Sequence, residues 1–241
     1  MTIESAANDP KEAERNLRTA HPYYQDDYVT LYHADCLQHL DMLNQADVMV
    51  TDPPYGYNVK LEFGDGNARR GKSPWAGTAI HGDNSLEARD SILSQWGDKP
   101  AIVFGSWKMP KPQGTKACLV WDKGLGAGMG DLSIPWKPNW EEIYILGTGY
   151  HGHRGTSVLT GHTVVSWASK ERNHPNMKPT TLMEELIRKC PPGTIIDPFA
   201  GSGSTLRAAK NLGRKAIGFE IDEKYCEITA QRLAQETLGI F

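Results

Sequence analysis

A glycine-rich stretch near the C-terminus could hold a nucleotide-like ligand. It reads TIIDPFAGSGST at residues 194–205 and joins a predicted strand to a predicted helix. Glycine has no Cβ, so a ligand can approach such a loop closely. The loop is a poor phosphate site, because Leu206 replaces the third glycine of a dinucleotide fingerprint and the lysine of a P-loop is missing. An ordinary turn between strand and helix is the structural alternative.

An acid on the following strand narrows the class of ligand. The strand predicted at residues 215–221 carries Glu220 at its end, and it is the next strand along the chain after the one that ends near Asp197. An acid in this place accepts hydrogen bonds from ribose hydroxyls. A glycine loop and a ribose-binding acid without phosphate chemistry indicate a nucleoside that carries a small charged group. S-adenosyl-L-methionine fits this description.

A second corner with candidate chemistry lies in the stretch DVMVTDPPYG at residues 47–56. An apolar run, typical of a buried strand, ends there in an acid, two prolines and a tyrosine. Proline fixes its own backbone angle, so this corner is rigid and has an aromatic tip. Taken alone, a tight turn at a strand end explains the pattern equally well. Its residues are Asp52, Pro53, Pro54 and Tyr55.

Strands and helices alternate along most of the chain, which predicts an α/β sheet with helices on both faces. Long irregular segments interrupt the alternation at residues 56–84 and 150–177, and long loops inside a domain are usually functional. We expect strands at 29–33, 47–50, 101–107, 117–123, 140–149, 193–199 and 215–221, and helices at 86–96, 180–189, 205–212 and 223–235, with helical spacing also at 34–43.

Composition limits the class of protein. A chain of 241 residues with 39% hydrophobic content can form one sizeable core. Its four cysteines are scattered and form no CxxC pair, which argues against a zinc site or a disulfide framework. We see neither a signal peptide nor an apolar run of about 18 residues, so we expect a cytoplasmic protein without a membrane span.

The two corners together resemble the amino-methyltransferases of DNA, which methylate exocyclic amines of adenine or cytosine. DPPY precedes DPFAGSGST, an order that resembles their permuted beta group. Further similar segments are YHADCLQHL, HPNMKPTTLMEELI with His174, Pro175, Lys178 and Pro179, and GFEIDEKYCEIT, so that the resemblance covers about residues 28–235.

The resemblance implies a Rossmann-like S-adenosylmethionine-dependent methyltransferase fold. Its mostly parallel sheet would have seven strands, one of them antiparallel, with helices on both faces. We expect an N-terminal arm at 1–27 and a single catalytic domain at 28–241, with small target-recognition loops at about 56–84 and 124–176. Apart from these loops there is no room for a separate recognition domain, so the target-reading region is small, which favours a short or relaxed target sequence or help from a partner.

The resemblance also assigns the catalytic corner. The Asp52 carboxylate and the Pro53 carbonyl, held by Pro54, would accept hydrogen bonds from both hydrogens of the target amine and localise its lone pair. Tyr55 would stack on a base flipped out of the helix. The amine would then attack the methyl group in line, without a covalent enzyme intermediate and without a metal.

Cofactor roles follow in the same way. Asp35 would contact the adenine, Glu220 the ribose and Asp197 the methionine amino group. Ser204 and Lys178 are candidates for the methionine carboxylate, Ser204 with help from a helix N-terminus. The complete predicted cofactor set is Asp35, Asp52, Lys178, Asp197, Phe199, Gly201, Gly203, Ser204, Thr205, Glu220 and Ile221.

DNA is the expected partner, and the resemblance suggests a restriction-modification system. The sequence does not decide whether the protein forms a homodimer or acts with a partner endonuclease. The net charge of −3 does not indicate a nucleic-acid binder, but residues 56–75 carry +2 and residues 150–178 carry +3. His151, His153 and His162 lack cysteine partners, so we prefer polar or DNA contacts to a metal site. Trp75, Trp136 and Trp140 could stack on bases, although packing is the commoner role of tryptophan.

Several functions remain in competition. Adenine N6 is favoured because Asp begins DPPY, whereas the cytosine-N4 enzymes often have Ser there; cytosine N4 is the alternative. Methylation of RNA or of a protein glutamine is a related hypothesis, but the protein enzymes usually have Asn at this position. A catalytically inactive nucleic-acid-binding regulator is disfavoured by the intact motifs, and a dehydrogenase by the missing third glycine.

Overall fold

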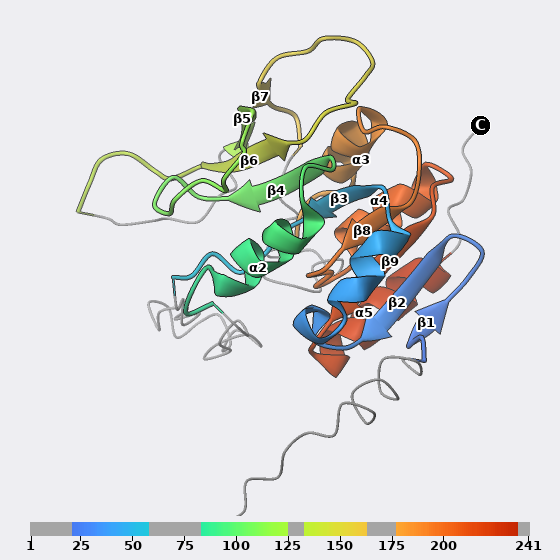
Figure 1. Ribbon diagram of the computed structural model, residues 1–241. Coiled ribbons are helices and arrows are strands. Elements are labelled where there is room, and N and C mark those ends of the chain that lie inside the picture. Colours follow the sequence, from blue (N-terminus) through green and yellow to red (C-terminus); the bar gives the residue numbers. More distant parts are fainter. Residues whose placement is uncertain (1–20, 58–82, 125–132, 163–176, 236–241) are drawn as a thin grey trace, which may run out of the picture.

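One nine-stranded sheet forms the centre of the protein in the computed structural model, which describes residues 21–57, 83–124, 133–162 and 177–235 (Figure 1). The strands lie in the order β1-β2-β9-β8-β3-β4-β6-β5-β7. Their bounds are β1 Tyr24–Gln25, β2 Val29–His33, β3 Val48–Thr51, β4 Ala101–Gly105, β5 Ala117–Asp122, β6 Trp140–Leu146, β7 Val158–Leu159, β8 Ile195–Asp197 and β9 Ala216–Glu220.

Most of the sheet is parallel. Strands β2, β9, β8, β3 and β4 run in one direction, whereas β6 is antiparallel to both β4 and β5. The predicted fold class and the antiparallel strand are therefore confirmed. The two-residue strands β1 and β7 extend the seven expected strands at the two edges, and β1 is also antiparallel to its neighbour.

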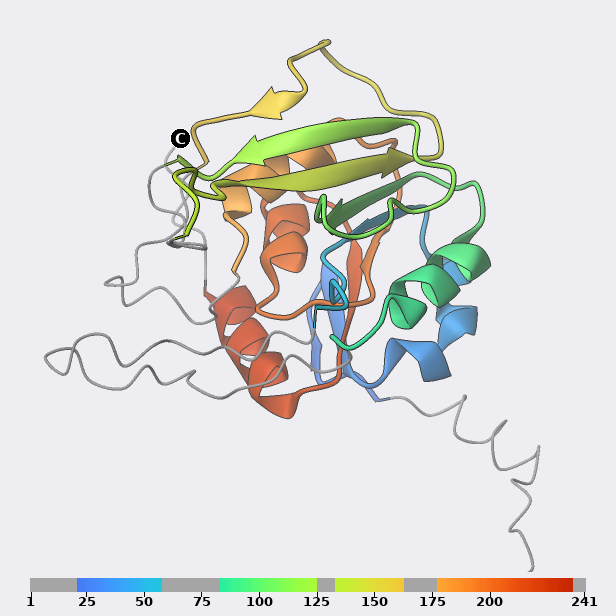
Figure 2. The same cartoon turned by 90° about the vertical axis from the view of Figure 1, so that its left-hand side faces the viewer.

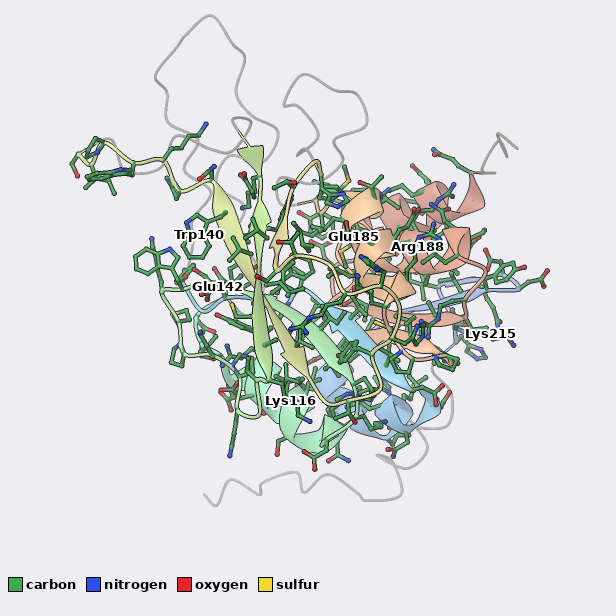
Figure 3. All side chains as sticks on the ribbon, turned by 90° about the horizontal axis from the view of Figure 1, so that it is seen from above. Lys116, Trp140, Glu142, Glu185, Arg188 and Lys215 are labelled. Atoms are coloured by element: carbon green, nitrogen blue, oxygen red, sulfur yellow. The ribbon has the colours of Figure 1, made fainter. Side chains whose placement is uncertain are left out.

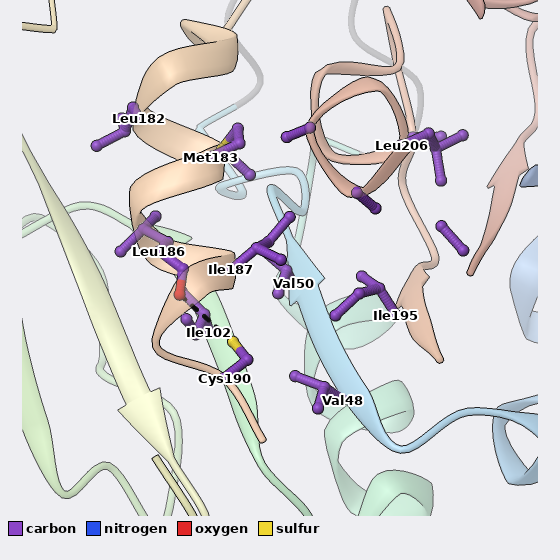
Figure 4. Packing of buried hydrophobic residues seen from close by; sticks show 14 of the residues in the cluster. Val48, Val50, Ile102, Leu182, Met183, Leu186, Ile187, Cys190, Ile195 and Leu206 are labelled. Carbon is purple, nitrogen blue, oxygen red and sulfur yellow. Dashed lines mark hydrogen bonds between the residues drawn. The ribbon is translucent and has the colours of Figure 1, made fainter. Parts of the chain in front are cut away.

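Helices cover both faces of the sheet, as Figure 2 shows. One face packs against α3, α4 and α5, and the other against α2 and two short 3-10 helices, η1 and η2. Figure 4 shows how Leu186 and Ile187 of α3 pack over Val50 of β3, all of them buried. The bounds are η1 Cys36–Gln38, η2 Leu40–Gln45, α2 Glu87–Trp96, α3 Thr180–Arg188, α4 Ser204–Asn211 and α5 Glu223–Ala234.

The segment with helical spacing at 34–43 does not form one α-helix. The Asp35 carboxylate accepts a hydrogen bond from the backbone N–H of Leu37 and caps η1, and His39 then adopts a non-helical conformation between η1 and η2. Leu37 remains 37% exposed, so only part of the apolar pattern is buried. Apolar spacing predicted the buried face here but not the backbone geometry.

The carboxyl ends of β2, β9, β8, β3 and β4 meet at one edge of the sheet. Ligands bind at this edge in open α/β sheets. Both predicted corners follow strands that end there, β3 and β8. Within the described residues, no helix is long and apolar enough to cross a membrane.

Candidate active site

The two corners predicted from the sequence lie side by side. Strands β3 and β8 pair directly, with Val48 opposite Ile195. At their carboxyl ends, the Thr51 hydroxyl donates a hydrogen bond of 2.7 Å to the Asp197 carboxylate. Residues that are far apart in the chain therefore share one site, because parallel pairing places their strand ends together.

The DPPY corner is held by hydrogen bonds at both ends. The Tyr55 hydroxyl donates to Asp52 Oδ1 at 2.7 Å. Gly56 has a φ of +78°, and its N–H donates at 2.8 Å to the buried carboxylate of Asp83. Tyr57 lies edge-on to Tyr55, with 6.2 Å between the ring centroids. The turn is thus a constrained structure whose carboxylate and ring have defined positions.

A buried lysine completes this corner. Lys178 Nζ lies 2.5 Å from Asp52 Oδ2 and 3.2 Å from Glu141 Oε2. The lysine is only 6% exposed, and its ammonium lies 5.0 Å from the centroid of the Phe104 ring. The other oxygen of Glu141 accepts from Lys123 Nζ, at the end of β5. Lys178 belongs to a sequence motif, whereas Glu141 and Lys123 were not predicted, because no local motif marks them.

The pKa values of these groups depend strongly on one another. Burial raises the pKa of the Asp52 carboxyl, and Lys178 opposes this effect. Burial would lower the pKa of Lys178, but the two carboxylates raise it above its ordinary value. Burial would raise the pKa of Glu141, but the two lysines lower it. Burial and the Asp52 charge hold the pKa of Tyr55 well above its usual value, so its hydroxyl keeps its proton.

The glycine loop lies between β8 and α4, as its sequence predicts. Gly201 and Gly203 have φ values of +52° and +76°, which side chains other than glycine rarely adopt. A Cβ on Gly203 would lie 2.5 Å from Thr229 Cγ2. The Thr229 hydroxyl donates to the Gly201 carbonyl at 2.9 Å, which ties the loop to α5.

Asp197 begins this loop and is almost fully buried, at 2% exposure. Its Oδ1 accepts from the Phe199 N–H at 3.1 Å as well as from the Thr51 hydroxyl. Thr205 at the start of α4 is also buried and lowers the pKa of Asp197 through a hydrogen bond. Burial nevertheless dominates and raises this pKa to about 6.

The ribose-binding candidate Glu220 ends β9 beside the glycine loop. One of its oxygens accepts from the Gly201 N–H and the other from the Asp222 N–H, both at 2.8 Å. Asp35 follows β2, the strand paired with β9, so the two acids lie on adjacent strand ends. Ile221 is 37% exposed and offers apolar surface next to Glu220.

Ser204 opens α4, and its hydroxyl donates at 2.8 Å to the Lys178 carbonyl. This bond joins the glycine loop to the segment that carries the buried lysine. The acids, the glycine loop and the exposed apolar side chain fit a nucleoside with a charged tail. The Lys178 ammonium is held by Asp52 and Glu141 rather than directed at the glycine loop by any described contact.

Other predicted contacts are only partly described. His174, Pro175 and Trp75 lie outside the described residues, as do the charged residues counted at 56–75 and those at 170–172.

Among the described residues, no group of three or more His, Cys, Asp and Glu could hold a metal ion. His162 instead lies 2.8 Å from Glu185 of α3. Trp136 is 76% exposed and Trp140 is 37% exposed.

Comparison with known proteins gives a consistent match. The family model described as DNA methylase, for N6 and N4 methyltransferases, matches residues 106–231, just over half of the chain. The type II methyltransferase M.ScaI of Streptomyces caespitosus is 27% identical over 296 residues, covering 98% of this chain and 91% of that protein.

Solved structures share the fold. The M1.HpyAVI–SAM complex is 22% identical with a TM-score of 0.59, over 86% of this chain and 100% of that chain. The PvuII DNA methyltransferase, described as cytosine-N4-specific, is 16% identical with a TM-score of 0.64, over 90% of both chains. At these identities, the structural likeness concerns the architecture alone.

Proposed function

This chain belongs to the N6/N4 family of DNA methylases, and we propose that it transfers a methyl group from S-adenosyl-L-methionine to the exocyclic N6 of adenine in DNA. The observation that carries the proposal is that the DPPY corner and the glycine loop follow paired strands, β3 and β8, whose ends are joined by the hydrogen bond from Thr51 to Asp197. The methyl acceptor and the methyl donor would then meet at one edge of the sheet.

The cofactor is S-adenosyl-L-methionine, which supplies an electrophilic methyl group when it is bound. The residues of the loop fit it. Glu220 would accept from the ribose hydroxyls, in place of its present bonds to backbone N–H groups, and Asp35 would contact the adenine. Ile221 and Phe199 would supply apolar contacts. Asp197 would pair with the methionine amino group, and the N-terminal end of α4, with Ser204 and Thr205, would face the methionine carboxylate.

The DPPY corner would activate the amine. A carboxylate has about four acceptor sites, and Tyr55 and Lys178 occupy only one each. Asp52 therefore retains sites for one amino hydrogen, while the Pro53 carbonyl would accept the other. Both bonds localise the lone pair of a poorly nucleophilic amine. Lys178 and Tyr55 would keep the carboxylate in place during this step.

The target base would have to leave the duplex, because its amine is otherwise paired and out of reach of the Asp52 carboxylate. Tyr55 would stack on the flipped base. Asp at the first position of DPPY supports adenine over cytosine, by resemblance to the family. The substrate would be DNA in the cytoplasm of a bacterial or phage-infected cell.

Methylation of plasmid DNA with S-adenosyl-L-methionine, followed by nucleoside digestion and mass spectrometry, tests the proposal. We expect N6-methyldeoxyadenosine. Formation of N4-methyldeoxycytidine would instead establish the alternative base. If calorimetry shows cofactor binding but neither base is modified, then DNA adenine is the wrong acceptor.

A further inference from the structure

Glu141 lies in the site without a role in the chemistry described above. Its side chain is 16% exposed, and its Oε2 is shielded from solvent and makes no hydrogen bond of good geometry. That oxygen is held by its charge contact of 3.2 Å with Lys178 Nζ. A buried carboxylate needs such a balancing charge, because burial alone strongly disfavours it.

Four charged groups from four segments form one balanced set. Asp52 follows β3, Glu141 is on β6, Lys123 follows β5, and Lys178 precedes α3. Two carboxylates and two ammonium groups sum to zero. Without Glu141, the set would carry one excess positive charge beside Asp52.

We propose that Glu141 is a positioning residue of the methyl transfer, which holds the Lys178 ammonium against Asp52 and balances its charge. Lys178 has few other restraints at its ammonium: the nearby groups are the Tyr55 ring, at 5.8 Å, and the Phe104 ring, at 5.0 Å. Glu141 is thus the group that fixes where Lys178 stands, and through it the orientation of Asp52. This inference rests on the proposed function.

Glu141→Gln tests the inference against a matched control, Glu142→Gln. The two residues are neighbours on β6 but face opposite sides of the sheet, and Glu142 accepts from the Tyr144 hydroxyl instead. Figure 3 labels Trp140 and Glu142 on this strand. We expect Glu141→Gln to slow single-turnover methylation by roughly 10- to 100-fold. Affinities for DNA and cofactor should change little, and Glu142→Gln should keep the wild-type rate.

The pH profile separates positioning from a purely structural role. The titratable groups that face Asp52 are Lys178, Glu141, Tyr55 and, from β8, Asp197. At saturating cofactor, Asp197 would be paired with the methionine amino group and would stay ionised across the profile. Glu141→Gln removes a negative charge near Asp52 and should therefore lower the pKa of Asp52, so that the acid limb of the pH–rate profile moves to lower pH. Loss of the opposite charge in Lys178→Met should move it to higher pH.

Glu141→Asp provides a second measurement in case the glutamine variant folds poorly. It keeps the charge but withdraws the carboxylate by one methylene, so we expect a wild-type acid limb and a rate between those of wild type and Glu141→Gln. If Glu141→Gln and Glu141→Asp both keep the wild-type rate and the wild-type acid limb of the pH–rate profile, the inference is overturned. Absence of methylation by the wild-type protein would instead overturn the proposed function, which distinguishes the two failures.

Discussion

The ammonium of Lys178 lies 2.5 Å from the carboxylate of Asp52, although 126 positions separate the two residues in the chain. The acid of the DPPY corner is therefore an anchored group with a buried cation on one side and the Tyr55 hydroxyl on the other. Such preorganisation is what an electrostatic site requires, because the acceptor need not reorient when the amine arrives.

Lys178→Met should destabilise the protein, because it leaves Asp52 and Glu141 without their common partner. Removing one partner of a buried ion pair costs about 3 kcal/mol or more. Urea unfolding of the free protein measures this loss. Lys116→Met is the control, since Lys116 is an exposed lysine, labelled in Figure 3. Equal stability of the two variants would contradict the account of the buried pair.

Asp197 should make the stability of the free protein depend on pH. Burial raises its folded pKa from 3.8 to about 6, so the folded state holds the proton more tightly than the unfolded state. The contribution of Asp197 to stability is then greatest below about pH 4 and declines as the pH rises through about 6, by about 3 kcal/mol in total. Denaturation curves of wild type and Asp197→Asn across this range measure the effect.

The asparagine variant should lose this decline and be more stable than wild type at pH 7. Cofactor binding should show the opposite preference, because the ionised carboxylate would pair with the methionine amino group. We therefore expect wild-type affinity for S-adenosyl-L-methionine to weaken as the pH falls below about 6. A decline in stability that persists in Asp197→Asn would assign the titration to another group.

Gly203→Ala should disrupt the cofactor loop. The position has a φ of +76°, and the added Cβ would lie 2.5 Å from Thr229 Cγ2. Gly213→Ala is a matched control, because its φ of +67° is similar but nothing lies within 4 Å of the new Cβ. Both variants should lose about 1 kcal/mol from backbone strain. Only Gly203→Ala should also lose cofactor affinity, as measured by calorimetry.

Trp136→Ala should weaken DNA binding. Trp136 is 76% exposed and precedes β6, whose first residues lie at the site edge of the sheet. Stacking of one base on an aromatic ring contributes about 1 kcal/mol or more, so we expect a loss of roughly fivefold or more in affinity. Tyr28→Ala is the control, since Tyr28 is 43% exposed and precedes β2, away from that edge. Equal DNA affinity of both variants would exclude Trp136 from the interface.

Much of the fold was predictable because its signals are local. The apolar run before Asp52 predicted β3, and the glycines after β8 predicted a loop between strand and helix there, in which Gly201 and Gly203 have positive φ. The edge strands β1 and β7 were not predictable, because two residues leave no periodic pattern. The segment at 34–43 shows that apolar spacing alone does not distinguish an α-helix from two 3-10 turns.

The charged part of the site was only partly predictable. Motif resemblance placed Asp52 and Lys178 in the site, but not in contact with each other. Glu141 lies on β6 and Lys123 directly follows its partner β5, and the sequence of this pair indicates only strands. Their place beside Lys178 results from tertiary packing of β6 against the segment before α3, which no short sequence pattern records.

The most direct test is transfer of a labelled methyl group from S-adenosyl-L-methionine to DNA by wild type and by Asp52→Asn, with cofactor affinity measured on the same samples. Asparagine keeps the size of the side chain and removes its charge. We expect the transfer rate to fall at least about 100-fold while the cofactor still binds. A rate close to that of wild type would contradict the central role of the Asp52 carboxylate.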